Sequence, residues 1–178
     1  ISAEAQSSED AVVIDGAVMT HSLSPMYRLL ILGAGDVAKF VAEMAIALEY
    51  DVMLCDPRPN YLDNWTVPGV ETTAQLPDDV VRERFSNPYS GIIALAHDPR
   101  VDDMALMEAL KTNAFYIGAM GSVRTSAARR ERLPELGLSS DEIDRLHAPI
   151  GFQINSKTPA EIAISVMAQI TSVRYQQQ

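Results

Sequence analysis

The chain has 178 residues, of which 47% are apolar and 21% are charged. Its 14 basic against 24 acidic residues leave a net charge of −10 at pH 7, which argues against attraction to nucleic acid or an anionic membrane. A single cysteine, Cys55, excludes a disulfide framework, and no apolar run is long enough to cross a bilayer. We therefore expect one cytoplasmic globular domain that binds neither membranes nor nucleic acid.

Residues 1–27 are acidic and contain no lysine or arginine. Within them, Ala11–Ile14 is a β-prone stretch followed by a turn at Asp15-Gly16, which is typical of a hairpin or of the remnant of an upstream domain. We interpret residues 1–27 as an N-terminal lead and residues 28–178 as the main domain.

From Arg28 onward, apolar β-type runs alternate with segments of helical period. This alternation predicts an α/β fold, Rossmann-like and doubly wound, with a mainly parallel sheet and helices on both faces. The expected strands are 28–32, 51–56, 90–96 and 114–118. The expected helices are 37–48, 77–85, 101–111, 121–133, 139–147 and 159–175. Residues 57–70 are expected to be irregular and 148–154 extended, and the apolar face of helix 101–111 comprises Val101, Met104, Ala105, Met107 and Leu110.

A glycine turn of the form G-x-G-x-x-A follows the first strand of the main domain, at Gly33–Ala38. Gly33 permits the tight turn, Gly35 lets the backbone approach a pyrophosphate, and amides at the helix start can hold phosphates. Asp56, at the end of the next strand, is placed to accept hydrogen bonds from a ribose diol. Arg58 would suit a 2′-phosphate. The pattern therefore makes NAD(P) one candidate cofactor.

Two residues near this turn limit what it can do. Asp36 adds a carboxylate that would repel a phosphate unless its side chain points away, and its alternative role is to cap the helix. Cys55 lies in a strand that we expect to be buried, and the carboxylate of Asp56 beside it raises a thiol's pKa. We therefore expect no nucleophile at Cys55.

A second strand, glycine turn and helix occur at Gly118–Arg124. Backbone amides near Gly121, the hydroxyl of Ser122 at the predicted N-cap and the guanidinium of Arg124 together predict an anion site. We assign the arginines further along the same helix to a solvated face; they are Arg129, Arg130 and Arg132.

The three histidines do not form a metal motif, because none has a second histidine four residues away or a cysteine beside it. His97, followed by Asp98, comes at the end of a predicted strand, where ligands bind in open α/β sheets. It is therefore a candidate binding residue. His147 is expected in a loop and His21 on the surface.

Six short motifs occur in order between Leu29 and about Arg174. They are Leu30–Ala38, Asp56–Arg58, His97-Asp98, Phe115–Ser122, His147–Gly151 and Lys157–Ala163. Together they resemble the C-terminal Rossmann domain of the XdhC/CoxI family, the accessory proteins of xanthine dehydrogenase and related molybdenum hydroxylases. On this resemblance, residues 1–27 would be the tail of the family's N-terminal domain.

The resemblance implies a chaperone that binds the molybdenum cofactor (molybdopterin), protects it while its terminal sulfur is installed and hands it to an apo-molybdenum hydroxylase. A cysteine desulfurase is a further implied partner, and no catalytic residue is required. One departure is that family members commonly carry histidine where this chain has Asp36. The cofactor-binding residues expected overall are Gly33, Gly35, Asp36, Asp56, Arg58, His97, Gly121, Ser122 and Arg124.

Two other functions stay open at this point. The first glycine turn and Asp56 are compatible with an NAD(P)-dependent oxidoreductase. The acidic surface is compatible with a non-catalytic interaction module that docks a partner enzyme. Methionine and aromatic residues in the C-terminal helix and the 57–70 stretch also favour a homodimer.

Overall fold

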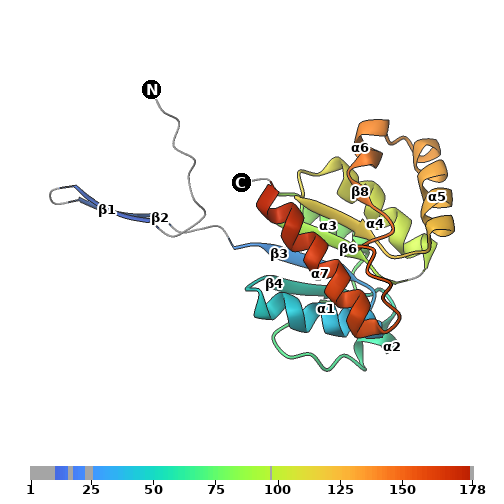
Figure 1. The fold of residues 1–178 in the computed structure, drawn as a ribbon, viewed down its shortest axis with the longest axis horizontal. Coiled ribbons are helices and arrows are strands. Elements are labelled where there is room, and N and C mark those ends of the chain that lie inside the picture. Colours follow the sequence, from blue (N-terminus) through green and yellow to red (C-terminus); the bar gives the residue numbers. More distant parts are fainter. Residues whose placement is uncertain (1–10, 16–17, 23–25, 97, 177–178) are drawn as a thin grey trace.

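The computed structural model describes residues 11–15, 18–22, 26–96 and 98–176. Within these residues, six strands form a parallel sheet in the order β5-β4-β3-β6-β7-β8. The strands are β3 (Arg28–Leu32), β4 (Asp51–Cys55), β5 (Glu71–Thr73), β6 (Ser90–Ala94), β7 (Tyr116–Ala119) and β8 (Leu146–His147). The order runs outward from β3 in both directions, as in a doubly wound Rossmann fold. The predicted fold class is confirmed (Figure 1).

Helices cover both faces of this sheet (Figure 1). One face carries α1 (Asp36–Ala47) and α7 (Pro159–Gln176), and the other carries α3 (Pro77–Arg84) and α4 (Pro99–Lys111). The remaining helices are α2 (Pro59–Leu62), α5 (Val123–Arg132), the 3-10 helix η1 (Leu133–Leu136) and α6 (Ser140–Asp144). In the described part of the chain, no helix is both long enough and apolar enough to span a membrane.

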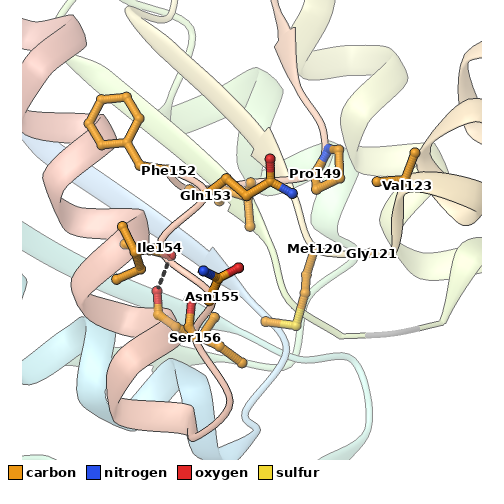
Figure 2. A pocket seen from close by; sticks show the side chains of 13 residues that line it. Met120, Gly121, Val123, Pro149, Phe152, Gln153, Ile154, Asn155 and Ser156 are labelled. Atoms are coloured by element: carbon orange, nitrogen blue, oxygen red, sulfur yellow. Dashed lines mark hydrogen bonds between the residues drawn. The ribbon is translucent and has the colours of Figure 1, made fainter.

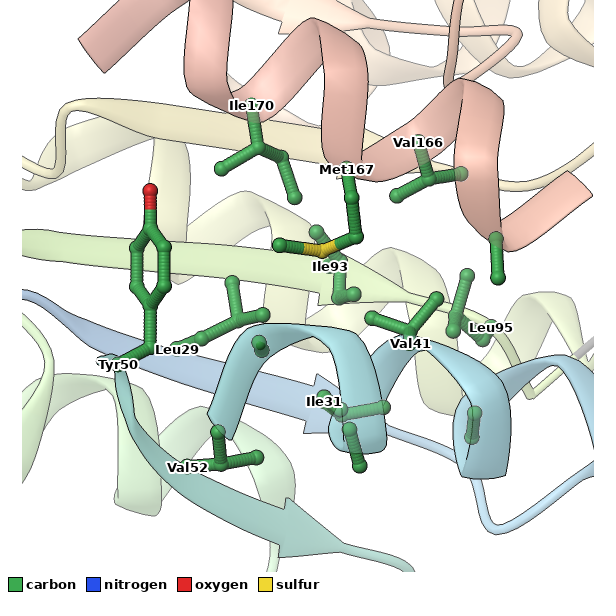
Figure 3. Packing of buried hydrophobic residues seen from close by; sticks show 14 of the residues in the cluster. Leu29, Ile31, Val41, Tyr50, Val52, Ile93, Leu95, Val166, Met167 and Ile170 are labelled. Carbon is green, nitrogen blue, oxygen red and sulfur yellow. The ribbon is translucent and has the colours of Figure 1, made fainter. Parts of the chain in front are cut away.

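The central strand β3 is buried on both faces, which explains its unbroken apolar run. Leu29 and Ile31 belong to the core cluster under α1 and α7, whereas Leu30 and Leu32 belong to the cluster under α3 and α4. Figure 3 shows the first cluster, with Val41 of α1 packed over the strand. Each such buried side chain contributes roughly 1.5–3 kcal/mol, so this strand is a main source of stability.

Three helix starts that the sequence predicts are confirmed. Before α7, Thr158 and Glu161 exchange hydrogen bonds between side chain and backbone, at 2.9 and 3.3 Å. Ser139 and Glu142 form the same capping box before α6, and Ser122 is the N-cap of α5. These bonds satisfy backbone amides that have no partner within the helix.

The N-terminal strands β1 (Ala11–Asp15) and β2 (Val18–Ser22) pair antiparallel, so the predicted hairpin is confirmed. The hairpin is a separate two-stranded sheet that projects from the rest of the molecule (Figure 1). The assignment of residues 1–27 to an upstream domain stays a prediction.

Three expectations about local structure are wrong. Residues 57–70 contain the one-turn helix α2, and the strand β5 that follows them was not predicted. The helix expected over 139–147 ends at Asp144 and is followed by β8, while residues 148–154 contain no strand. Both unexpected strands are at most three residues long and are held by backbone pairing to β4 or β7, which leaves no side-chain pattern to detect.

Candidate functional site at the carboxyl edge of the sheet

The carboxyl ends of the inner strands are level with one another. Leu32 of β3 is paired with Cys55 of β4 and with Ala94 of β6, and Ala94 is paired with Ala119 of β7. The turns that follow these strands therefore meet at one edge, on both sides of the point where the chain direction across the sheet reverses. Ligands of open α/β sheets bind at this edge.

Gly33 brings the first glycine turn against the turn that follows β6. Its φ is +98°, and a Cβ at this position would lie 2.4 Å from the Cα of Ala96. Its amide donates to the carbonyl of Cys55 at 2.9 Å. Only glycine fits here, because any larger residue would combine an unfavourable φ with a clash against backbone.

Gly35 faces open space. A Cβ built on Gly35 would meet no atom within 4 Å. Gly35 is also the N-cap residue of α1, and no side chain caps the helix there. Asp36 is the first residue of α1 rather than its cap, so the capping role considered from the sequence is wrong. Its carboxylate is exposed and lies 3.8 Å from Nζ of Lys39, along the helix surface.

Asp56 is fully buried, and its carboxylate accepts hydrogen bonds from groups of the protein itself. Oδ2 accepts from the amide of Ala34 at 2.9 Å and from Nη2 of Arg58 at 2.8 Å. Oδ1 accepts from the amide and Nε of Arg58, at 3.0 and 2.8 Å. A carboxylate offers about four lone-pair positions, so these four bonds leave none for a ribose diol in this arrangement.

The same contacts set the charge state of Asp56. Burial opposes ionisation, but the hydrogen bonds from Arg58 and Ala34 outweigh it, so the pKa of the carboxyl lies below its usual value. Arg58 in turn stacks on the ring of Tyr61, with Cζ 3.9 Å from the ring centroid. The guanidinium is thereby held by one edge and one face.

The second glycine turn carries a different set of groups. The hydroxyl of Ser122 accepts from the amide of Thr125 at 3.1 Å, as expected of an N-cap. A Cβ on Gly121 would lie 2.6 Å from Oγ1 of Thr125, so this turn packs closely on its own helix. Arg124 is exposed and makes no hydrogen bond or ion pair with another described residue. It is therefore available to an anion.

Two cavities open at this edge, one toward the face of the sheet that carries α3 and α4 and one toward the face that carries α7. A cavity of about 390 Å³ is lined by Pro57, Arg58, Leu76, Pro77, Asp98, Val101 and Met104. A second cavity, of about 460 Å³, lies between the β7–α5 turn, residues 149–156 and the start of α7 (Figure 2). Both volumes fall in the range of small-molecule sites.

Hydrogen bonds fix the loop that walls the larger cavity. Gln169 of α7 accepts at its side-chain oxygen from the amide of Gly151 at 2.8 Å and from the hydroxyl of Tyr116 at 2.5 Å. The amide of Ile150 donates to the carbonyl of Ala119 at 3.0 Å. The loop is thus tied to both β7 and α7 before it turns outward.

The assignment of the arginines after Arg124 to a solvated face is wrong for Arg129 and Arg130, whereas Arg132 is exposed and pairs with Asp103. Arg129 is buried; its Nε donates to Asp103 at 2.7 Å, and its Nη2 lies 3.6 Å from Asp102. Arg132 donates to the same Asp103 at 2.6 Å, and Arg130 donates to carbonyls of residues 143 and 146. These bonds join α5 to α4, α6 and β8.

Cys55 and the histidines behave differently from one another. Cys55 is buried, as expected, and burial followed by the charge of Asp56 raises the pKa of its thiol to about 12. His147 lies in β8 rather than in a loop and stacks on Tyr116 at 4.7 Å. His97 lies outside the described residues. Among the described residues, no cluster of histidine, cysteine or carboxylate side chains could hold a metal ion.

Comparison with known proteins decides the family. The XdhC Rossmann domain matches residues 29–170. The chain belongs to the XdhC family. The resemblance noted in the sequence is thereby confirmed.

Several known proteins are similar to this chain over most of its length. The chain is 31% identical to the molybdenum cofactor insertion chaperone PaoD of Escherichia coli, over 86% of this chain and 42% of that protein. It is 27% identical to a probable xanthine dehydrogenase subunit of Bacillus subtilis, over 85% of this chain and 44% of that protein. A crystal structure described as a xanthine dehydrogenase from Bacillus halodurans superposes with a TM-score of 0.74 at 28% identity, over 90% of this chain and 46% of that one. The chain spans less than half the length of each of these proteins.

Some residues of this XdhC domain's candidate site were not found from sequence. The sequence predicts Met104 on the apolar face of helix 101–111, yet the residue is 51% exposed and lies at the rim of the smaller cavity. Leu76 lines the same cavity from the start of α3, and Gln169 holds the loop of the larger one. The only sequence signal was that Leu76 and Met104 are large apolar residues near helix starts.

Proposed function

We propose that this chain is an accessory protein that binds the molybdenum cofactor during maturation of a xanthine dehydrogenase-type molybdoenzyme and catalyses no reaction itself. The observation that carries the proposal is the 31% identity to a protein named as a molybdenum cofactor insertion chaperone, over 86% of this chain. The proposal treats the cofactor as cargo.

Groups at the carboxyl edge of the sheet support this proposal. The cofactor is a pterin that ends in a phosphate, and the open face at Gly35 lets an anion approach the start of α1. Arg124 and the amides near Gly121 and Ser122 would bind the terminal phosphate. Asp36, turned toward Lys39, leaves the first turn accessible.

The remaining proposed contacts have supporting roles. Gly33 would shape the first turn, and Asp56 would hold Ala34 and Arg58 in position rather than contact the ligand. His97, which lies outside the described residues, stays a proposed contact. The proposed partners are an apo-molybdenum hydroxylase, a cysteine desulfurase and a second copy of the chain.

An NAD(P) oxidoreductase is less well supported. The acidic residue at the end of the second strand of a dinucleotide site binds the ribose. In this chain the equivalent carboxylate, Asp56, is buried and already accepts four hydrogen bonds. The site therefore lacks the group that would select that cofactor.

Anaerobic binding of released molybdenum cofactor tests the proposal. The chain is mixed with cofactor, separated by gel filtration and assayed for molybdenum and for the fluorescent oxidised pterin. We expect cofactor to elute with the protein, and Arg124→Ala to weaken retention about 10-fold because a charge-assisted contact to phosphate is lost. Lys111→Ala, at the far end of α4, is the matched control. Failure to retain cofactor, together with tight NAD binding, would refute the proposal.

A further inference from the structure

The cavity beside Arg58 differs in character from an anion site. Most of its wall is apolar and comes from three segments, namely the residues after β4, the start of α3 and the start of α4, and the charged residues that line it are Arg58 and Asp98. Two of the rim residues, Leu76 and Met104, are large apolar side chains with more than half of their surface exposed, at 56% and 51%. Apolar side chains gathered around a concave site indicate a binding surface.

Arg58 lines this cavity, and its neighbours hold its guanidinium in a fixed orientation. Asp56 engages one edge of its guanidinium through Nε and Nη2, both at 2.8 Å, and Tyr61 covers one of its faces. Nη1 forms no hydrogen bond with another described residue. The group therefore offers one edge nitrogen and its second face.

The buried charge of Asp56 decides what Arg58 can recognise. Because the carboxylate lies at hydrogen-bonding distance, the pair is close to neutral and attracts a free phosphate weakly. A planar guanidinium held in this way stacks on flat ring systems and donates hydrogen bonds to their edges. Pre-organisation of Arg58 lowers the entropy that such binding costs.

We propose that this cavity binds a planar heterocycle, stacked on Arg58 and packed against Met104. The inference rests on the proposed function, since the molybdenum cofactor contains such a ring in its pterin and a second one in its dinucleotide forms. The cavity is lined by residues that follow β4, β5 and β6, on the face of the sheet that carries α3 and α4, while Gly121 and Arg124 follow β7.

Two sets of ligands distinguish the two sources of the ring. Calorimetric titration with GMP and CMP tests a nucleobase, and titration with neopterin tests the pterin. We expect one set to bind, and Met104→Trp to weaken that binding at least about 10-fold by filling the cavity. Ile164→Trp is the matched control, because Ile164 has the same 51% exposure on α7 and does not line the cavity.

A second variant and a direct reporter keep the test independent of folding. Arg58→Lys retains the charge but removes the flat face, so binding should also fall about 10-fold while thermal unfolding reports any loss of fold. In protein labelled at methionine methyl groups, the Met104 signal should move on ligand addition because of the ring current, and Met104→Leu identifies that signal. Binding that both variants leave within twofold of wild type, or no binding by either set, overturns the inference.

The same variants separate this inference from the proposed function. If wild-type protein and Met104→Trp retain molybdenum cofactor equally well and neither set of ligands binds, the cavity inference fails while the accessory role stands. If heterocycles bind at Met104 but cofactor is not retained, the cavity inference stands and the proposed function fails.

Discussion

The buried carboxylate of Asp56 accepts a hydrogen bond from the amide of Ala34 at 2.9 Å, which joins the end of β4 to the first glycine turn. The turn is therefore held by a side chain from the neighbouring strand as well as by its own backbone. A residue that sequence analysis assigns to ligand binding thus has a structural part in shaping the site.

Replacement of Gly33 by alanine should destabilise the protein by about 2 kcal/mol or more. The new Cβ would lie 2.4 Å from the backbone of Ala96, and φ is +98°. Urea unfolding measures the effect. Gly35→Ala is the matched control and should change stability by less than about 1 kcal/mol, since its Cβ would meet open space. Equal losses for both variants would contradict the assignment of Gly33 as the packed position.

Asp102 should make stability depend on pH. Burial raises the pKa of its carboxyl to about 6, with Arg129 opposing the shift. A carboxyl whose pKa is higher in the folded state favours folding fully below the unfolded pKa of about 3.9, and this contribution is lost as pH rises through about 6.

Asp102→Asn removes that titration. Relative to wild type, the variant should gain about 1–3 kcal/mol between roughly pH 4 and pH 7.5, measured as the difference in unfolding free energy. Asp141→Asn, an exposed substitution on α6, serves as the control. A difference that does not change with pH would show that Asp102 ionises normally in the folded protein.

Asp103→Ala should cost about 3 kcal/mol or more, because it removes the partner at 2.7 Å from the buried guanidinium of Arg129. Glu108→Ala, also on α4, breaks the exposed pair between Glu108 and Arg82 and should cost much less. Chemical denaturation of both variants at neutral pH gives the comparison. If the two costs are similar, the arginine cluster of α5 contributes no more than a surface pair does.

Gln169→Leu should loosen the loop that walls the larger cavity. The amide of Gly151 and the hydroxyl of Tyr116 would lose their shared acceptor, at a cost of about 1–3 kcal/mol. Hydrogen exchange of the Gly151 amide should accelerate more than that of amides in β3. Ser172→Leu, also on α7, is the control. Unchanged exchange at Gly151 would mean that Gln169 does not hold the loop.

Much of the fold was accessible from sequence because its signals are local. The buried strand Leu29–Leu32, the glycine turn after it and the capping pair of Thr158 and Glu161 each carry their physical cause within a few neighbouring residues. The short strands β5 and β8 were missed because pairing with β4 and β7 holds them. No nearby residue records such pairing.

Some features of the candidate site could likewise be predicted from the sequence, and others could not. Gly33, Gly35 and the N-cap Ser122 follow from turn chemistry, so the sequence by itself determined where the glycine turns lie and which family they indicate. Only the tertiary structure decided that Asp56 is saturated by Ala34 and Arg58 and that Arg129 is buried against Asp102 and Asp103. The contacts of Asp56 with Ala34 and of Arg129 with Asp102 and Asp103 join residues 22 to 27 positions apart, whereas Arg58 is only two residues from Asp56. Burial and charge pairing across such separations arise from packing, and packing is a property of the folded chain.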